Sequence, residues 1–146
     1  AYTFNQVEEA AGAVLAANDC GVPIAVSFVV ETDGCLDNGI GLEEAIDQVD
    51  ALTVNAAAYF MVNCAHPDYF SHVLTGHPRL KGMAVNASRC SHAELDNATE
   101  LDDGDPDELS AEVVRLVNEY PSFTIVGGCW GSDFRHMRKM AAGIAD

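Results

Sequence analysis

Hydrophobic residues recur along this chain in two alternating patterns. Stretches with apolar positions three and four residues apart predict helices, because that spacing places them on one helical face. Short, nearly continuous apolar runs rich in β-branched residues predict strands that are buried on both faces. The predicted helices span residues 5–18, 42–52, 67–74, 107–120 and 133–144, and the predicted strands span 23–30, 57–62, 82–86 and 123–126.

Residues with strong local preferences support these boundaries. Gly21 follows the first predicted helix as a terminator, Pro106 stands where a first helical turn tolerates proline, and Asp133 can cap the last helix. Gly127 and Gly128 predict a turn directly after the last strand. The segment 87–106 is long and polar, and no strand or long helix is predicted there.

The order of predicted elements alternates between helix and strand, which is typical of parallel strands joined by crossover helices. Two α/β architectures fit this order. One is a small doubly wound sheet, and the other is the C-terminal half of a (β/α)8 TIM-type barrel, which typically needs about 250 residues. The pattern alone leaves both open.

Composition narrows the functional classes. The chain has 146 residues, 49% of them hydrophobic, and a formal net charge of −16. The length and apolar content predict one domain with a core. The negative charge argues against binding to nucleic acid or to an anionic membrane surface. No apolar run reaches the roughly 20 residues of a membrane span, and no signal peptide is evident.

The cysteines carry the most specific chemical signal. There are five, at positions 20, 35, 64, 90 and 129, without a CxxC pair, so reduced thiols in the cytoplasm are expected. Cys64 and Cys129 each follow a predicted strand, and the carboxyl ends of parallel strands meet at one edge of a sheet. Two converging thiolates are soft ligands that favour zinc. Alternatively, each is a small buried apolar residue.

Several other chemistries find no support in the sequence. There is no GxSxG nucleophile elbow, no GxGxxG fingerprint and no P-loop. A serine hydrolase and a nucleotide-binding enzyme are therefore not expected.

The same segments resemble the homocysteine S-methyltransferase family. The motifs are Val62-Asn63-Cys64 and Gly127-Gly128-Cys129, which are specific in combination. Further matching segments are 27–34, 59–67, 86–88, 91–96 and 104–106, with Asp133, Arg135 and His136. The resemblance covers essentially the whole chain and corresponds to the last four strands of the family's barrel.

This resemblance implies a fold, a reaction and a set of residues. It implies a (β/α)8 barrel in which three cysteines hold zinc. It also implies methyl transfer from a donor such as S-methylmethionine, S-adenosylmethionine or a betaine to homocysteine, which gives methionine. Cys64 and Cys129 would be the catalytic metal ligands, and Asn63 and Asn86 would lie beside the site and orient the substrate.

The chain departs from the family in two respects. Trp130 stands where the family motif Gly-Gly-Cys-Cys has its second cysteine, and tryptophan cannot ligate zinc. Cys35, Cys90, His66 and His92 are the residues that could complete the site. The chain also accounts for only four of eight strands, which predicts two exposed sheet edges. Either the natural protein is longer, or two copies pair into an eight-stranded homo-oligomer.

Two alternatives to the methyltransferase interpretation stay open. One is a degenerate, non-catalytic half-barrel that acts through oligomerisation. The other is a different metal-dependent barrel enzyme that uses His66 or His92 as a ligand.

Overall fold

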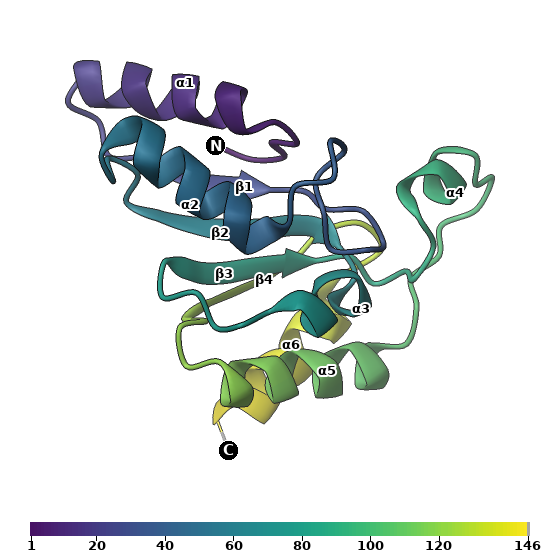
Figure 1. The fold of residues 1–146 in the computed structure, drawn as a ribbon. Helices are drawn as coiled ribbons and strands as arrows, with labels where there is room; N and C mark the ends of the chain where they lie inside the picture. Colours follow the sequence, from purple (N-terminus) through teal and green to yellow (C-terminus); the bar gives the residue numbers. More distant parts are fainter. Residues whose placement is uncertain (146) are drawn as a thin grey trace.

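The fold is α/β, with one sheet of four parallel strands in the order β1-β2-β3-β4 (Figure 1). The structure is a computed structural model and describes residues 1–145. The strands are β1 (Ala25–Phe28), β2 (Tyr59–Ala65), β3 (Leu80–Val85) and β4 (Ile125–Gly128). The helices are α1 (Val7–Asp19), α2 (Leu42–Thr53), α3 (Pro67–Phe70), the 3-10 turn η1 (Ser71–Val73), α4 (His92–Asp96), α5 (Pro106–Glu119) and α6 (Phe134–Ala145).

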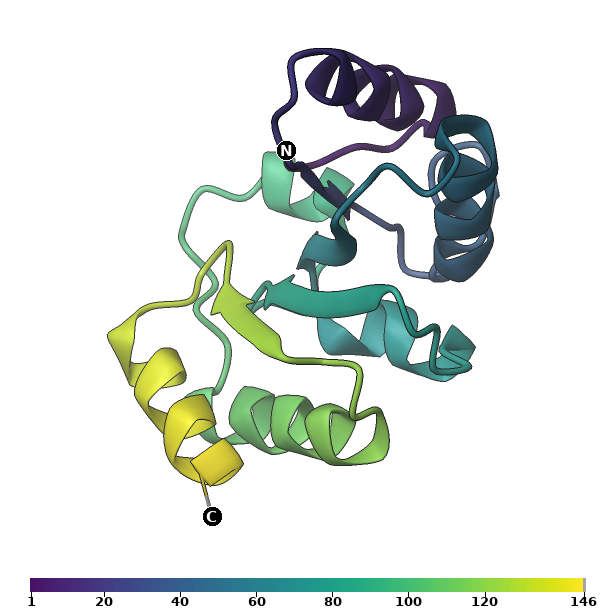
Figure 2. The ribbon, with the colours of Figure 1, turned by 90° about the vertical axis from the view of Figure 1, so that its left-hand side faces the viewer.

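The long helices α1, α2, α5 and α6 lie along the outer side of the sheet, as Figure 2 shows, whereas the short helix α4 lies beyond the ends of the strands. Alternate strand residues point toward those helices: Phe28 and Phe60 are fully buried, and their rings stack with centroids 6.2 Å apart. The intervening residues Met61 and Asn63 face the opposite, inner side, where they line a cavity. Every helix within residues 1–145 is too short or too polar to cross a lipid bilayer.

One of the two sheet edges predicted to be exposed is in fact covered. Residues 1–4 run parallel to β1 and continue the sheet by backbone hydrogen bonds. The amide of Ser27 donates to the carbonyl of Ala1 (2.9 Å), and the amides of Phe4 and Val29 donate to the carbonyls of Ser27 and Phe4 (3.0 and 2.9 Å). The expectation of two open edges is therefore wrong for β1. In residues 1–145, the remaining open edge is β4.

The last strand and one helix differ from the sequence prediction. β4 begins at Ile125 and includes Gly127 and Gly128, which were expected to turn; they pair with Ala84 and Val85 of β3 instead. The turn comes later, at Gly131, whose φ of 75° suits glycine. The short helix α4 lies within the polar segment for which no helix was predicted.

The turn that leads into β3 depends on one carboxylate of α2. Glu43 accepts hydrogen bonds from the amides of Thr75, Gly76 and His77 at 3.0–3.1 Å, and from the hydroxyl of Thr75. Although partial burial raises the pKa of Glu43, these hydrogen bonds outweigh it and lower the pKa below its ordinary value. The charged carboxylate thus stabilises the folded state.

We expect Glu43→Gln to lower the free energy of unfolding at neutral pH by about 2 kcal/mol, because a charged acceptor of several hydrogen bonds is lost. Glu43 has a lowered folded pKa. Its contribution is therefore complete above the ordinary pKa of glutamate, about 4.3, and is lost as the pH falls through the folded value. Urea unfolding across this range should show the difference between wild type and variant shrinking toward acid pH. Glu44→Gln, at the exposed neighbouring position, is the control.

Candidate functional site

The two cysteines that the sequence predicted to converge lie side by side at the carboxyl ends of β2 and β4. Cys64 and Cys129 are 65 positions apart in the sequence, yet their Cα atoms are 5.3 Å apart and their sulfurs are joined as a disulfide. The amide of Cys129 donates to the carbonyl of Val85 (2.8 Å), so Cys129 is aligned with the end of β3. The convergence is confirmed, and it follows from parallel strands ending at one edge; the expectation of reduced thiols is wrong for this pair in the structure.

Cys64 lies at an irregularity in β2. The register between β2 and β3 shifts from Asn63 to Ala65, so Cys64 is the extra residue of a bulge, and its φ is 53°. A non-glycine residue is held in this left-handed region only when its surroundings fix it. Its carbonyl accepts hydrogen bonds from Asn86 Nδ2 (2.9 Å) and from His92 Nε2 (2.7 Å).

Asn63 links this site to the N-terminal segment. Its Nδ2 lies 3.1 Å from Cys64 Sγ and donates to Thr3 Oγ1 (3.0 Å), while its Oδ1 accepts from the amide of Thr3 (3.0 Å). Asn63 and both cysteines line a cavity of about 470 Å³ on the inner side of the sheet. The other lining residues are Tyr2, Thr3, Met61, Ala84, Ile125, Val126, Gly127 and Gly128.

Asn86, the second predicted substrate residue, is engaged differently. Its side chain is 2% exposed, Nδ2 donates to the carbonyl of Cys64, and Oδ1 accepts from the amide of Trp130 (3.1 Å). It does not line the cavity that holds Asn63. Asn86 therefore ties the two cysteine-bearing segments together, and this position favours a structural contribution over direct contact with a substrate.

His92 and Glu31 form a pair beside Cys64. His92 Nδ1 lies 3.1 Å from Glu31 Oε1, and Nε2 contacts the carbonyl of Cys64. Both partners are hydrogen-bond acceptors, an arrangement that favours the protonated form of the ring. Burial opposes that charge, but the hydrogen bonds to Cys64 and Glu31 together raise the pKa of His92.

A three-sulfur zinc site does not fit these residues. Trp130 occupies the position after Cys129, and its side chain is 46% exposed. The thiols of Cys35 and Cys90 lie near oxygens of Asp33 and Asp102, respectively. Within residues 1–145, the only three His, Cys, Asp or Glu ligand atoms that gather within 4.8 Å belong to a different cluster. Cys64 and Cys129, which are bonded to each other here, therefore have no third ligand beside them among residues 1–145.

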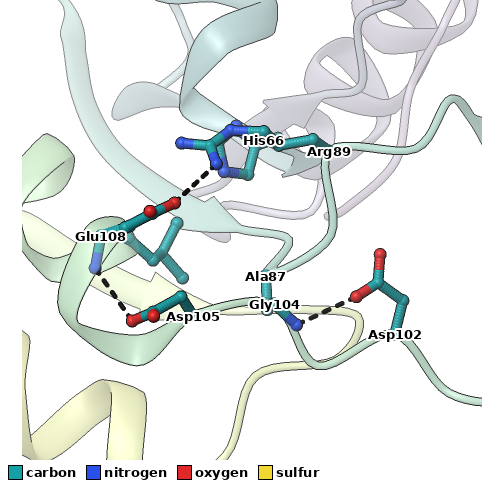
Figure 3. Close-up of a pocket in the computed structure, with 8 residues that line it drawn as sticks. His66, Ala87, Arg89, Asp102, Gly104, Asp105 and Glu108 are labelled. Carbon is teal, nitrogen blue, oxygen red and sulfur yellow. Dashed lines mark hydrogen bonds and ion pairs between the residues drawn. The ribbon is translucent and has the colours of Figure 1, made fainter.

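That other cluster consists of His66, Asp68 and Glu112. Of these, His66 also lines a second cavity, of about 200 Å³, which Figure 3 shows together with Arg89 and Glu108. Arg89 already pairs with Asp68 (2.8 Å) and Glu112 (2.5 Å), and also with Glu108 (2.8 Å). Burial lowers the pKa of His66 to about 4, so this ring is neutral. A guanidinium therefore neutralises the carboxylates that a cation would need.

The comparison with known families identifies the family of the chain. A family model for homocysteine S-methyltransferase matches residues 1–144. The chain belongs to the homocysteine S-methyltransferase family. A search of curated proteins finds no match. The family relationship assigns methyltransferase and homocysteine chemistry at the level of the family.

The sequence predicted some of the residues that the structure places together at the carboxyl ends of the strands. It identified Cys64, Cys129 and Asn63, which the structure brings together, and Asn86, which lies beneath them. It missed Thr3 and the pair of His92 with Glu31. His92 was considered only as a replacement metal ligand, and both of its nitrogens are engaged elsewhere. A contact between residues 61 positions apart leaves no local signal in the sequence.

Proposed function

We propose that this chain carries the thiol-binding site of a homocysteine S-methyltransferase. The observation that supports this best is the convergence of Cys64 and Cys129 at a cavity on the inner side of the sheet. In a parallel α/β sheet, the carboxyl ends of the strands are where ligands bind. The cysteines must be reduced to act, so the proposal includes a reducing compartment such as the cytoplasm.

The proposed reaction transfers a methyl group to the sulfur of homocysteine and yields methionine. The thiol proton passes to water, and a new carbon–sulfur bond forms at the methyl carbon. The bond from that carbon to the onium centre of the donor breaks, and its electron pair stays on the donor. S-methylmethionine, S-adenosylmethionine and a betaine are the donor classes that have such a methyl group. Asn63 is proposed to orient the substrate because its amide lies in the cavity beside Cys64.

Zinc is the cofactor proposed for the family's reaction, where it stabilises a thiol as the thiolate. In this chain the reduced Cys64 and Cys129 would supply two of its ligands. Because the described residues offer no third ligand there, we assign no step of the reaction to the metal.

The domain is proposed to be half of a (β/α)8 barrel formed by residues 1–146. Its inner face and the β4 edge would then be covered by further strands, supplied by a longer natural chain or by a second copy. Residues 1–4 already occupy the edge of β1. A second copy would therefore have to pair with this segment rather than with β1 itself.

Binding of homocysteine to the reduced chain tests the proposal. We expect homocysteine to perturb the NMR signals of residues around the cavity, whereas homoserine, with oxygen in place of sulfur, should not. In the presence of Zn²⁺, Cys64→Ser and Cys129→Ser should each weaken homocysteine binding about tenfold or more, because serine replaces a soft thiolate ligand with a hard hydroxyl. Cys20→Ser, at an exposed cysteine beyond α1, is the matched control.

The outcomes separate the three functional alternatives. If the folded chain does not distinguish homocysteine from homoserine, the methyltransferase proposal fails and a degenerate half-barrel is favoured. If a metal stays bound after both cysteines are replaced, a different metal-dependent enzyme is favoured. The structure offers little support for the latter, because Arg89 pairs with both carboxylates of the His66 cluster.

A further inference from the structure

We infer that Thr3 is a positioning residue that orients the carboxamide of Asn63, so that an amide N–H faces the sulfur end of the cavity. The inference deepens the proposed function and rests on it, because Asn63 is the residue proposed to orient the substrate. Thr3 acts through Asn63, and the inference involves no metal.

The backbone of Thr3 adopts a conformation that is rare for its residue type. Its φ is 67°, in the left-handed region, where a β-branched residue is an outlier. Such a conformation persists only when the surroundings hold it, and such residues concentrate at functional sites. Thr3 belongs to the segment 1–4 that runs beside β1 (Figure 1), and it lines the cavity that holds both cysteines. Among residues 1–145, the side chain to which it is hydrogen-bonded is that of Asn63.

Thr3 and Asn63 form a reciprocal pair of hydrogen bonds. The backbone amide of Thr3 donates to Asn63 Oδ1, and Asn63 Nδ2 donates to Thr3 Oγ1, both at 3.0 Å. A backbone amide can only donate, so the atom that faces it must be the oxygen of the carboxamide. Nδ2 is therefore the atom that lies 3.1 Å from Cys64 Sγ. Thr3 thus determines which end of the carboxamide faces the sulfur.

The carboxamide has little freedom to turn over. Asn63 is 2% exposed and lies within β2, where it pairs with Ala84 of β3. In the reversed orientation, its NH₂ group would face the Thr3 amide, so that two donors would meet without an acceptor. The carboxamide oxygen would then lie against Cys64 Sγ. Leaving a donor without an acceptor is unfavourable, so the contacts with Thr3 select one of the two orientations.

A donor in this place suits the proposed substrate. Homocysteine reacts through its sulfur, and a sulfur that has lost its proton is a charged acceptor that forms strong hydrogen bonds. The N–H of Asn63 that now meets Cys64 Sγ can donate to a substrate sulfur that lies beside this cysteine. A carboxylate in place of the carboxamide would repel such a sulfur. Thr3 and Asn63 together therefore favour a sulfur acceptor at this end of the cavity.

Binding of homocysteine to the chain, reduced with a phosphine so that no other thiol competes, tests the inference. We expect Asn63→Asp to weaken binding about tenfold or more, because aspartate can keep both contacts with Thr3 but has no N–H for the sulfur. Thr3→Ala should weaken binding about fivefold, since one of the two hydrogen bonds that orient the carboxamide is lost. Thr3→Ser keeps the hydroxyl and should bind like wild type. Thr124→Ala, at an exposed threonine before β4, is the matched control and should also bind like wild type.

The NMR signals of the Asn63 side-chain amide separate positioning from a purely structural role. Thr3→Ala should shift these signals while the backbone signals of β3 and β4 stay in place and the melting temperature changes little. If Thr3 contributed only to stability, homocysteine affinity would instead follow the melting temperature.

The outcomes distinguish this inference from the proposed function. If wild type binds homocysteine and Thr3→Ala binds it equally well, Thr3 is not a positioning residue, whatever the result for Asn63→Asp, and the proposed function stands. If wild type does not distinguish homocysteine from homoserine, the proposed function fails, and the inference with it.

Discussion

Replacing Trp130 with cysteine is expected to raise the zinc affinity of the reduced chain by about 100-fold or more. The wild-type site has two sulfurs, whereas structural and catalytic zinc sites have at least three protein ligands. A missing ligand should cost more than the 10–100-fold typical of lost outer-shell contacts. The new sulfur would follow Cys129 directly, on a backbone that is already held at both its amide and its carbonyl.

Competition with a chromophoric zinc chelator measures this affinity. The indole of Trp130 is nearly half exposed, so its removal should cost the fold little. Trp130→Ser is the control, because it removes the indole without adding a sulfur. Equal zinc affinities for wild type, Trp130→Ser and Trp130→Cys would contradict the prediction. Cys64→Ser in the Trp130→Cys background should abolish the gain.

The parallel sheet was predictable because its strands are buried and read as continuous apolar runs. The error in β4 has a physical cause: Phe123 was counted as a strand residue because it is apolar. Its ring instead packs edge-on against Tyr120 just beyond α5, with centroids 6.4 Å apart. The two glycines after Val126 then continue the pairing with β3, because the hydrogen bonds of a sheet join backbone atoms and need no side chain.

The short helix α4 could have been predicted from its cap. Ser91 and Glu94 form a capping box, in which Ser91 Oγ accepts from the amide of Glu94 and the Glu94 carboxylate accepts from the amide of Ser91. The Ser-x-x-Glu spacing is visible in the sequence. The helix was not predicted because the surrounding segment is polar and has no apolar residues at helical spacing. Recognising the helix would have placed His92 at its first position.

The site itself was predictable only to the extent that strand ends determine it. Cys129 follows β4, and Cys64 lies within β2 near its carboxyl end rather than after it, so their convergence still follows from the topology. The contact of Asn86 with both cysteine segments requires side-chain positions that a one-dimensional pattern does not contain. The same holds for the interaction of Thr3 with Asn63, which joins residues 60 positions apart.

Asn86→Ala is expected to lower the free energy of unfolding of the reduced chain by about 2–3 kcal/mol. The substitution leaves the amide of Trp130 without its acceptor and removes one of two donors to the Cys64 carbonyl. A buried polar group that loses its partner costs about 1–3 kcal/mol, and the Cys64 carbonyl keeps the hydrogen bond from His92. Urea unfolding under reducing conditions measures the difference.

Asn97→Ala is the matched control, since Asn97 is exposed and its side chain donates to one carbonyl within α4. Its effect should stay below about 1 kcal/mol. The comparison also decides how Asn86 contributes. If Asn86 only binds substrate, Asn86→Ala should unfold like the control and lose homocysteine binding alone. If Asn86 joins the two cysteine segments, as its contacts indicate, Asn86→Ala should unfold at a clearly lower urea concentration than the control, because both hydrogen bonds between the segments are lost.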